Sequence, residues 1–489
     1  MRKCWILVAL VASSLRVGSA GERDSHTTGL PTPAIHALNL ENAVHDGYAA
    51  RTDRVDGAGG YACGGCACGG CACGLGLLDW NVGERLKGLP FGPCGSLDVG
   101  GQYRMRYHNE NNMRRAGLTG MDDEFMLYLT RVWLEARFHS FSTVRAEFMD
   151  AASFGEAISP RANEVNRHDL YQLYADLVWW DGQGKLTSRV GRQEMKYGSA
   201  RLIMAPEWAN RRRAHDGVRL TWDGPNWTSD AFWVRPIYRD PAHFYRFDST
   251  NLDQELYGIY NTYKGLEHDK LDLYWLAYDF VNDAGTHRYD TLGTRYHGGR
   301  GPWVYEFEGG YQFGRNPDGT DHSAGFFTGG IGRKFDREWE PELWIFYDWA
   351  SGADTVGNGF HTYVQRAHYY LGWMDLFGRR NLEDVNARLT LKPTDKLTLV
   401  AWYHYFMLAN GNDVAYNLNM RPFAGMTAGQ AGSQDLGHEL DLVATWQVTD
   451  QLQLRVGYSH FWSGRFYDTS PVPYSGNANF AYSHMLFNF

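Results

Sequence analysis

Five arginines stand where apolar and polar residues alternate along the chain: Arg104, Arg131, Arg145, Arg388 and Arg455. A guanidinium stays charged at physiological pH, and its fork of donors fits a carboxylate. Many such groups around one aqueous space would bind an anionic solute repeatedly and weakly, as passage through a pore requires. The alternative interpretation is that these arginines pair with carboxylates of the same wall and brace it. The candidate partners are Glu135, Glu306, Glu308, Glu439 and Asp441.

Two pairs of carboxylates lie two residues apart on one strand face, Glu439 with Asp441 and Glu306 with Glu308. Paired carboxylates are also the groups that a glycoside hydrolase uses. A water-filled β-barrel, however, carries same-face carboxylates whatever it transports. No phosphate-cradling glycine loop or nucleophile elbow occurs in a supporting context. We therefore predict that the protein is not an enzyme and needs no cofactor.

A run of three arginines, Arg211, Arg212 and Arg213, falls in a long loop. Electrostatic attraction would let this run gather an anionic polymer at the extracellular mouth of a pore. The alternative interpretation is an ordinary solvated loop.

A second long loop covers residues 351–382 and carries His368, Tyr369, Tyr370 and Asp375. Loops of this length are usually functional or disordered. We predict that this loop folds inward as a constriction or gate.

A five-residue repeat near the N-terminus contains Cys63, Cys66, Cys68, Cys71 and Cys73. Thiolates two residues apart can hold a soft metal ion. A zinc ribbon, however, separates its two cysteine pairs by a folded spacer, whereas here one residue intervenes. We interpret the repeat as a flexible low-complexity segment, with a metal or surface-attachment role as the alternative and Cys94 as a further thiol partner.

Strands must hold the charged positions, because the polarity alternates with a period of two. The clearest case is the stretch 438–447. Its outward set is Leu440, Leu442, Ala444 and Trp446, and its inward set is Glu439, Asp441, Val443 and Thr445. In the stretch 169–179 we expect Tyr171, Leu173, Ala175, Leu177 and Trp179 to face outward. Apolar side chains outside and charged ones inside are typical of a transmembrane β-barrel.

The alternation predicts an all-β fold with about eighteen antiparallel strands. The expected strands are 97–108, 126–138, 143–150, 169–179, 186–193, 218–222, 229–237, 255–264, 271–280, 289–296, 303–313, 323–333, 342–349, 384–391, 397–408, 438–447, 452–462 and 478–489. An even number brings both ends of a barrel to the periplasm. We therefore expect the last strand, which ends on Phe489, to hydrogen-bond with the first.

Three segments organise the chain: a signal peptide (1–20), a low-complexity segment (21–94) and the barrel (95–489). Arg2 and Lys3, an apolar run and Gly18-Ser19-Ala20 are typical of a secretory signal. Past this segment no apolar run approaches the ~20 residues of a spanning helix. The formal net charge of -9 argues against a nucleic-acid partner. The predicted location is the bacterial outer membrane.

Several short motifs resemble those of the alginate-export family of outer-membrane barrels. They are Val190-Gly191-Arg192-Gln193, Tyr347-Asp348-Trp349-Ala350-Ser351-Gly352, Asn381-Leu382-Glu383-Asp384, Trp402-Tyr403-His404-Tyr405-Phe406 and Gly437-His438-Glu439-Leu440-Asp441-Leu442-Val443. The resemblance implies an eighteen-stranded channel that passes an anionic uronic-acid polysaccharide through an arginine-rich constriction. It places Arg192, Glu439 and Asp441 on matched positions along the pathway.

The expected partners follow from this interpretation. They are outer-membrane lipid, an anionic polysaccharide or small anions, and periplasmic secretion partners. Two other functions remain open at this point: a general diffusion porin without polymer specificity, and a secreted, soluble, β-rich carbohydrate-active protein.

Overall fold

The structure is a computed structural model that describes residues 83–489 except 93–94, 115–116, 239–244, 283 and 364–366. The predicted signal peptide, the cysteine repeat and Cys94 lie outside the described residues. Among the described residues, no helix is long and apolar enough to cross a membrane.

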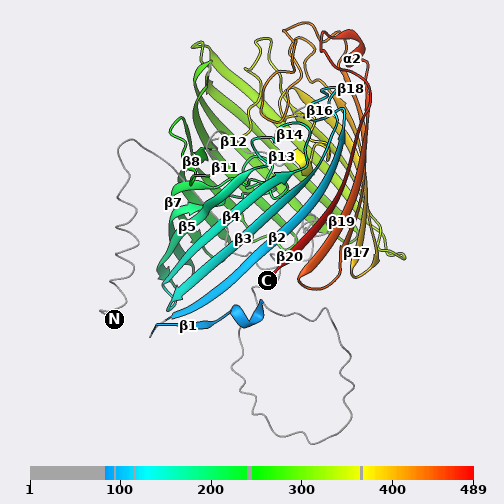
Figure 1. Cartoon of the computed structure of the whole chain (residues 1–489). Coiled ribbons are helices and arrows are strands. Elements are labelled where there is room, and N and C mark those ends of the chain that lie inside the picture. The colour runs from blue at the N-terminus through cyan, green and yellow to red at the C-terminus, as the bar shows by residue number, and fades with distance from the viewer. Residues whose placement is uncertain (1–82, 93–94, 115–116, 239–244, 283, 364–366) are drawn as a thin grey trace, which may run out of the picture.

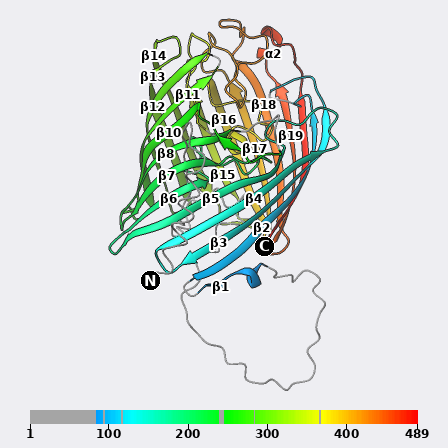
Figure 2. The same ribbon diagram turned by 60° about the vertical axis from the view of Figure 1, so that its left-hand side comes forward.

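Eighteen antiparallel strands form a closed barrel (Figures 1 and 2), as the alternation predicted. They are β2 (Gly95–Asn111), β3 (Asp123–Phe138), β4 (Ser142–Phe154), β5 (Asn166–Asp181), β6 (Lys185–Gln193), β7 (His215–Asp223), β8 (Trp227–Tyr238), β10 (Gln254–Tyr263), β11 (Asp269–Asn282), β12 (Gly285–Arg300), β13 (Trp303–Arg315), β14 (Asp321–Lys334), β15 (Glu342–Ala350), β16 (Leu382–Thr394), β17 (Leu397–Met407), β18 (Asp435–Gln447), β19 (Leu452–Ser463) and β20 (Ala478–Asn488). Short additional elements are η1 (Glu84–Leu86), β1 (Leu89–Phe91), β9 (Ser249–Thr250), η2 (Ala367–Tyr369) and α2 (Phe466–Thr469).

The barrel closes where its last strand pairs with its first. β20 lies antiparallel to β2, with Met485 opposite Met105 and His484 opposite Arg106. The prediction that these two strands hydrogen-bond is therefore confirmed. Closure leaves no free strand edge, which is a requirement for a sheet surrounded by lipid.

The two faces of the wall differ as the alternation predicted. In β18, Leu442 is 45% exposed on the outside, whereas Glu439 and Asp441 are completely buried on the inside. Apolar side chains on the outer face gain contact with lipid, and the charged ones avoid it. The interior is therefore the place to look for a functional site.

Tyr171 departs from the predicted pattern. The neighbouring residues Glu147 and Phe148 of β4 pair with Gln172 and Leu170 of β5. Tyr171, which lies between these two β5 residues, therefore has no partner in β4 and is an extra residue in its strand. Such a β-bulge lets two successive side chains turn to the same face. Tyr171 is only 1% exposed, and its hydroxyl donates to Glu194. The prediction that it faces outward is wrong, because period-two counting cannot see a bulge.

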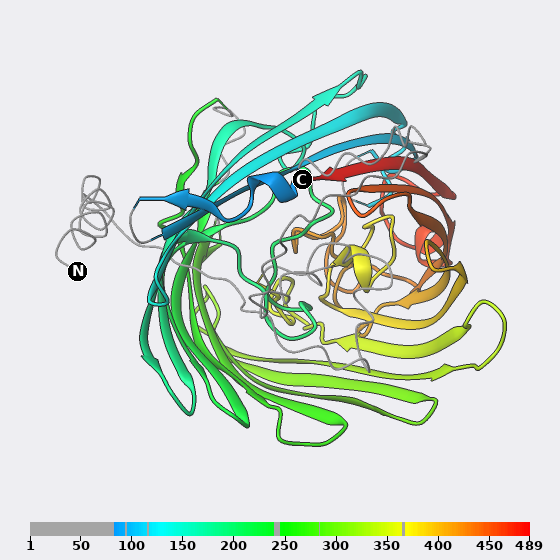
Figure 3. The same cartoon turned by 90° about the horizontal axis from the view of Figure 1, so that it is seen from below.

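Short turns join the strands at one end of the barrel, and most of the connections at the other end are long. We name three of the long connections L3 (194–214), L7 (351–381) and L8 (408–434). Seen along the barrel in Figure 3, described loop segments lie within the ring of strands. These loops and the wall that they touch form the candidate site.

Candidate functional site

L3 spans the interior from one wall to the opposite one. On β2, Arg106 Nη1 donates to the carbonyl of Trp208 at 2.8 Å. On β13, Glu306 Oε1 accepts a hydrogen bond from Arg201 Nη1 of L3 at 2.8 Å. β2 and β13 are far apart in the strand order, so L3 crosses the lumen and holds both walls.

L7 meets L3 inside the barrel. The ring of His368 stacks on Trp208, with centroids 4.0 Å apart and planes 14° apart. The Tyr370 hydroxyl donates to the carbonyl of Ser199 at 2.6 Å. L7 therefore folds inward and contacts L3, and a role of this loop as constriction or gate stays a prediction.

Glu439 and Asp441 hold L7 against the wall. The backbone N–H of Met374 donates to Glu439 Oε1 at 2.9 Å, and that of Trp373 donates to Asp441 Oδ2 at 3.3 Å. The preceding Gly372 has φ +82°, and a Cβ there would lie 2.5 Å from Glu439 Oε1. Both side chains face the interior, where L7 covers them, and a role of this acidic pair in a solute pathway stays a prediction.

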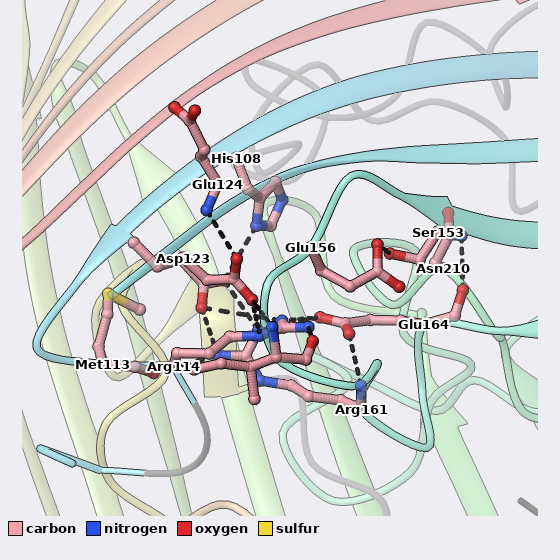
Figure 4. Close-up of polar contacts among 12 residues, drawn as sticks. His108, Met113, Arg114, Asp123, Glu124, Ser153, Glu156, Arg161, Glu164 and Asn210 are labelled. Atoms are coloured by element: carbon pink, nitrogen blue, oxygen red, sulfur yellow. Dashed lines mark hydrogen bonds and ion pairs between the residues drawn. The ribbon is translucent and has the colours of Figure 1, made fainter. Parts of the chain in front are cut away.

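A polar network fixes L3 at the long-loop end of the wall (Figure 4). Arg114 contacts Asp123 at 3.1 Å and Glu164 at 2.8 Å, and all three side chains are buried. The Asn210 amide of L3 donates to the carbonyl of Glu164 at 2.8 Å. Breaking a buried ion pair is strongly destabilising, because it leaves an uncompensated charge. This end of L3 is therefore anchored.

Some of the predicted arginines brace the wall. Arg131 contacts Glu147 at 2.5 Å. Arg145 contacts Glu147 at 2.9 Å and Glu135 at 3.2 Å. The bracing interpretation fits these two, because their positive charges are matched by carboxylates on the same wall.

A second set of arginines surrounds the β19–β20–β2 seam. Arg455, His484 and Arg106 are successive cross-strand partners. Arg104 donates to two backbone carbonyls and to the Asn210 side chain, all neutral groups of L3. Neither ring nitrogen of His484 has a hydrogen-bond partner among the described residues. Positive charge is therefore concentrated along this seam.

Arg388 faces the lumen from β16 and belongs with the second set. Its guanidinium lies 5.0 Å from the centre of the Trp402 ring, in a cation–π arrangement. Within the described ranges it makes no ion pair with a carboxylate. It can therefore offer its charge to a solute.

Arg192 has the outward register of its strand, but its side chain is largely buried and lines the small pocket that Arg212, Arg213 and Tyr171 also line. In β6 it shares the register of Val190, which is 37% exposed to the outside, and it pairs with Asp216 of β7 at 2.9 Å. The lumenal arginine of this strand is Arg189, which contacts Asp176 and the Tyr174 ring. The motif that suggested Arg192 carries no register information, whereas the hydrogen-bonded pairing does.

Arg211 and Arg212 are not displayed on a solvated loop. Arg211 is buried and pairs with Asp248, and Arg212 pairs with Glu194 at 2.9 Å. Burial and the neighbouring Arg211 lower the pKa of Arg213, which lines a small pocket with Arg212 and Tyr171. The solvated-loop interpretation is wrong because L3 folds inward. A role for the run in gathering anions stays a prediction.

Sequence reasoning left Arg106 out of the candidate pathway, although the alternation places it on the inward face, and it missed Arg201 and Trp208. Arg106 shares the register of Arg104 and was accessible to the same parity argument. Arg201 and Trp208 lie in L3, where no alternation exists to give their direction. Among the described residues, no group of three or more His, Cys, Asp or Glu side chains is arranged to hold a metal ion.

A family comparison decides what kind of barrel this is. Residues 96–481 match the model of the family described as alginate export. The chain belongs to the alginate export family. No curated protein sequence matches this alginate-export chain.

Solved structures resemble this alginate-export barrel in fold. OccD3 (OpdP) of Pseudomonas aeruginosa has a TM-score of 0.55 and 12% identity, covering 80% of this chain and 91% of its own. OccAB1 of Acinetobacter baumannii has a TM-score of 0.55 and 12% identity, and the match covers 80% of this chain and 96% of OccAB1. The outer membrane protein OprD of P. aeruginosa has a TM-score of 0.52 and 12% identity, and the match covers 80% of this chain and 94% of OprD. Family and fold are those of outer-membrane channels, so the protein is a channel of the outer membrane in contact with its lipid.

His368 should make the contact between L3 and L7 depend on pH. Burial lowers the pKa of its ring, and Arg106 acts in the same direction, against the opposing effects of Asp375 and Asp441. A His368 released from the stack would recover a pKa near the ordinary ~6.5. Protonation therefore favours the released form as the pH falls below ~6.5, and the stacked form is favoured above it.

We expect the open probability of the alginate-export channel to rise between about pH 7.5 and about pH 5.5 in planar bilayers. His368→Phe should keep a stack with Trp208 and lose this pH dependence. A wild-type channel that gates identically at both pH values would contradict the role of His368.

Proposed function

We propose that the barrel conducts anionic saccharides, with an alginate-like polyuronate as the preferred class, across the outer membrane. The observation that carries this proposal is the seam set, in which Arg104, Arg106 and Arg455 gather around His484, whose ring nitrogens lack a hydrogen-bond partner in the described part of the chain. Arg104 and Arg106 make their described hydrogen bonds with neutral groups of L3. Carboxylates would replace those neutral groups as the solute passes.

The seam set and Arg388 differ physically from the bracing arginines. Arg131 and Arg145 are already matched by carboxylates, so a solute carboxylate would have to compete with Glu147 and Glu135. An arginine bound to neutral groups gains more from a carboxylate, because charge-assisted hydrogen bonds are roughly twice as strong as neutral ones. Several such sites in series give a ligand places to enter and to leave.

L3 and L7 cover the seam set in this structure, since Arg104 and Arg106 contact L3 and Trp373 of L7 lies against Tyr482. The proposal therefore requires these loops to move aside during conduction. A solute that passes through the lumen would then meet these arginines one after another. Periplasmic secretion partners stay a prediction.

Ion selectivity tests the proposal directly. We expect Arg388→Gln together with Arg455→Gln to lower the anion-to-cation permeability ratio several-fold and to weaken block by oligomeric polyuronate, because two lumenal charges are removed. Zero-current potentials in a salt gradient measure the ratio. The matched control is Arg333→Gln, which removes one exposed arginine from the outward face of β14 and should leave selectivity unchanged.

A wild-type channel without anion preference and without polyuronate block would refute the proposal and favour a general diffusion porin. Heat-dependent gel mobility confirms that each variant is folded. A selective wild type with an unaffected double variant would place the selective charges elsewhere in the lumen.

A further inference from the structure

By register, a row of charged residues follows the outer face of the barrel near the long-loop ends of eight strands. Arg235 in this row is buried, whereas Arg288, Arg315 and Asp321 are exposed. Each member has the outward register of its strand, and each lies beside the next across the sheet. The row consists of Arg192, Asp216, Arg235, Glu255, Asp279, Arg288, Arg315 and Asp321.

The row marks the upper boundary of the apolar wall. Below it on the same strands, Leu292 is 53% exposed and Tyr311 is 54% exposed, and Phe313 stacks on Tyr311 with centroids 5.9 Å apart. Aromatic side chains are enriched at the height where acyl chains give way to headgroups. Long loops are extracellular in bacterial barrels. The row therefore lies at the headgroups of the outer leaflet.

Most neighbours in the row have opposite charges. Arg192 contacts Asp216 at 2.9 Å, and Arg235 contacts Glu255 at 3.6 Å. In each of these contacts the positive charge of an arginine is neutralised by a carboxylate of the neighbouring strand. They leave little for a ligand to neutralise.

Two neighbouring pairs break this order, because Glu255 lies opposite Asp279 and Arg288 lies opposite Arg315. Like charges directly opposite one another destabilise a sheet. Arg315 is 64% exposed as a side chain and contacts the exposed Asp321 at 2.9 Å, a pair of small energetic value. Arg288 is exposed and lies opposite Asp279 of β11, but it makes no direct ion pair with any residue that the structure describes. Two guanidinium groups thus share one place at the headgroup level.

We propose that Arg288 and Arg315 bind the phosphate group of an anionic lipid of the outer leaflet. One phosphate can accept paired hydrogen bonds from both guanidinium forks, which removes their mutual repulsion. Acyl chains below the phosphate would lie on Leu292, Tyr311 and Phe313. Free phosphate has the charge but not the acyl chains, so this combination of groups favours a lipid.

Lipid retention by the full-length barrel tests the proposal. The purified protein is placed in nanodiscs of phosphatidylcholine with a minor fraction of phosphatidic acid, and the lipid that stays with it on detergent extraction is measured by mass spectrometry. We expect enrichment of phosphatidic acid over its share in the nanodisc. Arg288→Gln together with Arg315→Gln should reduce that enrichment about tenfold.

The matched control is Arg300→Gln with Arg333→Gln, which removes two arginines at the short-turn ends of β12 and β14 and should keep the enrichment. Absence of enrichment in the wild type, or equal enrichment in both double variants, would overturn the proposal. Displacement of the lipid by millimolar inorganic phosphate would also overturn it, because the site would then recognise a free anion. The wild-type measurement decides the question even if a variant fails to fold.

Discussion

Replacing Trp208 by alanine should make the channel open far more often. Trp208 stacks on His368 of L7 and carries the Arg106 guanidinium 3.6 Å from its ring centre. An aromatic pair contributes about 1 kcal/mol and a cation–π contact about another 1 kcal/mol. Losing both should shift the balance between closed and open loops about 30-fold toward open. Single-channel recordings in planar bilayers would show this as longer openings or larger mean conductance.

Trp303→Ala is the control for this experiment. Trp303 is an equally large side chain exposed on the outer face of β13, away from both loops. Its removal should leave conductance as in the wild type. Unchanged conductance in a folded Trp208→Ala variant would show that the contact between L3 and L7 does not limit the opening.

Removing the acidic pair should free L7 from the wall. Glu439→Ala with Asp441→Ala deletes the acceptors for the backbone N–H groups of Met374 and Trp373. Leaving a buried N–H group without an acceptor costs about 1–3 kcal/mol. Trypsin should then cut L7 at Arg379 or Arg380, both of which are buried in the docked loop. We expect cleavage at least about tenfold faster than in the wild type.

A conservative double variant separates hydrogen bonding from charge. Glu439→Gln with Asp441→Asn keeps a carbonyl oxygen in reach of each N–H group and should protect L7 nearly as well as the wild type. Rapid cleavage of this variant would assign the docking to negative charge instead. Slow cleavage of the double alanine variant would show that other contacts of L7 are sufficient.

The barrel was predictable from the sequence because lipid imposes one rule on every strand. Outward residues such as Leu442 must be apolar, and inward ones such as Asp441 are free to be polar, so each strand reports its own orientation. The pairing of β2 with β20 followed from closure alone. Tyr171 was assigned to the wrong face, since one bulge changes the parity and leaves the residue types unremarkable.

The candidate site was predictable only where it lies on strands. Arg104, Arg388, Arg455, Glu439 and Asp441 all face inward as their parity indicated. Loop residues obey no such period, so the contact between Trp208 and His368 could not be inferred. The acidic pair illustrates the remaining gap: its lumenal position was visible, but its partners are backbone N–H groups of a loop 65 or more residues away.

L3 also has a mechanical consequence. Arg201 ties it to Glu306 on one wall and Arg106 ties it to the opposite wall, so the loop acts as a cross-brace over the barrel's diameter. A thin cylinder without a brace flattens easily under lateral pressure from the membrane, whereas a braced one keeps its cross-section. Widening the passage therefore means releasing at least one attachment, and the shape of the wall should change in the same step as the opening.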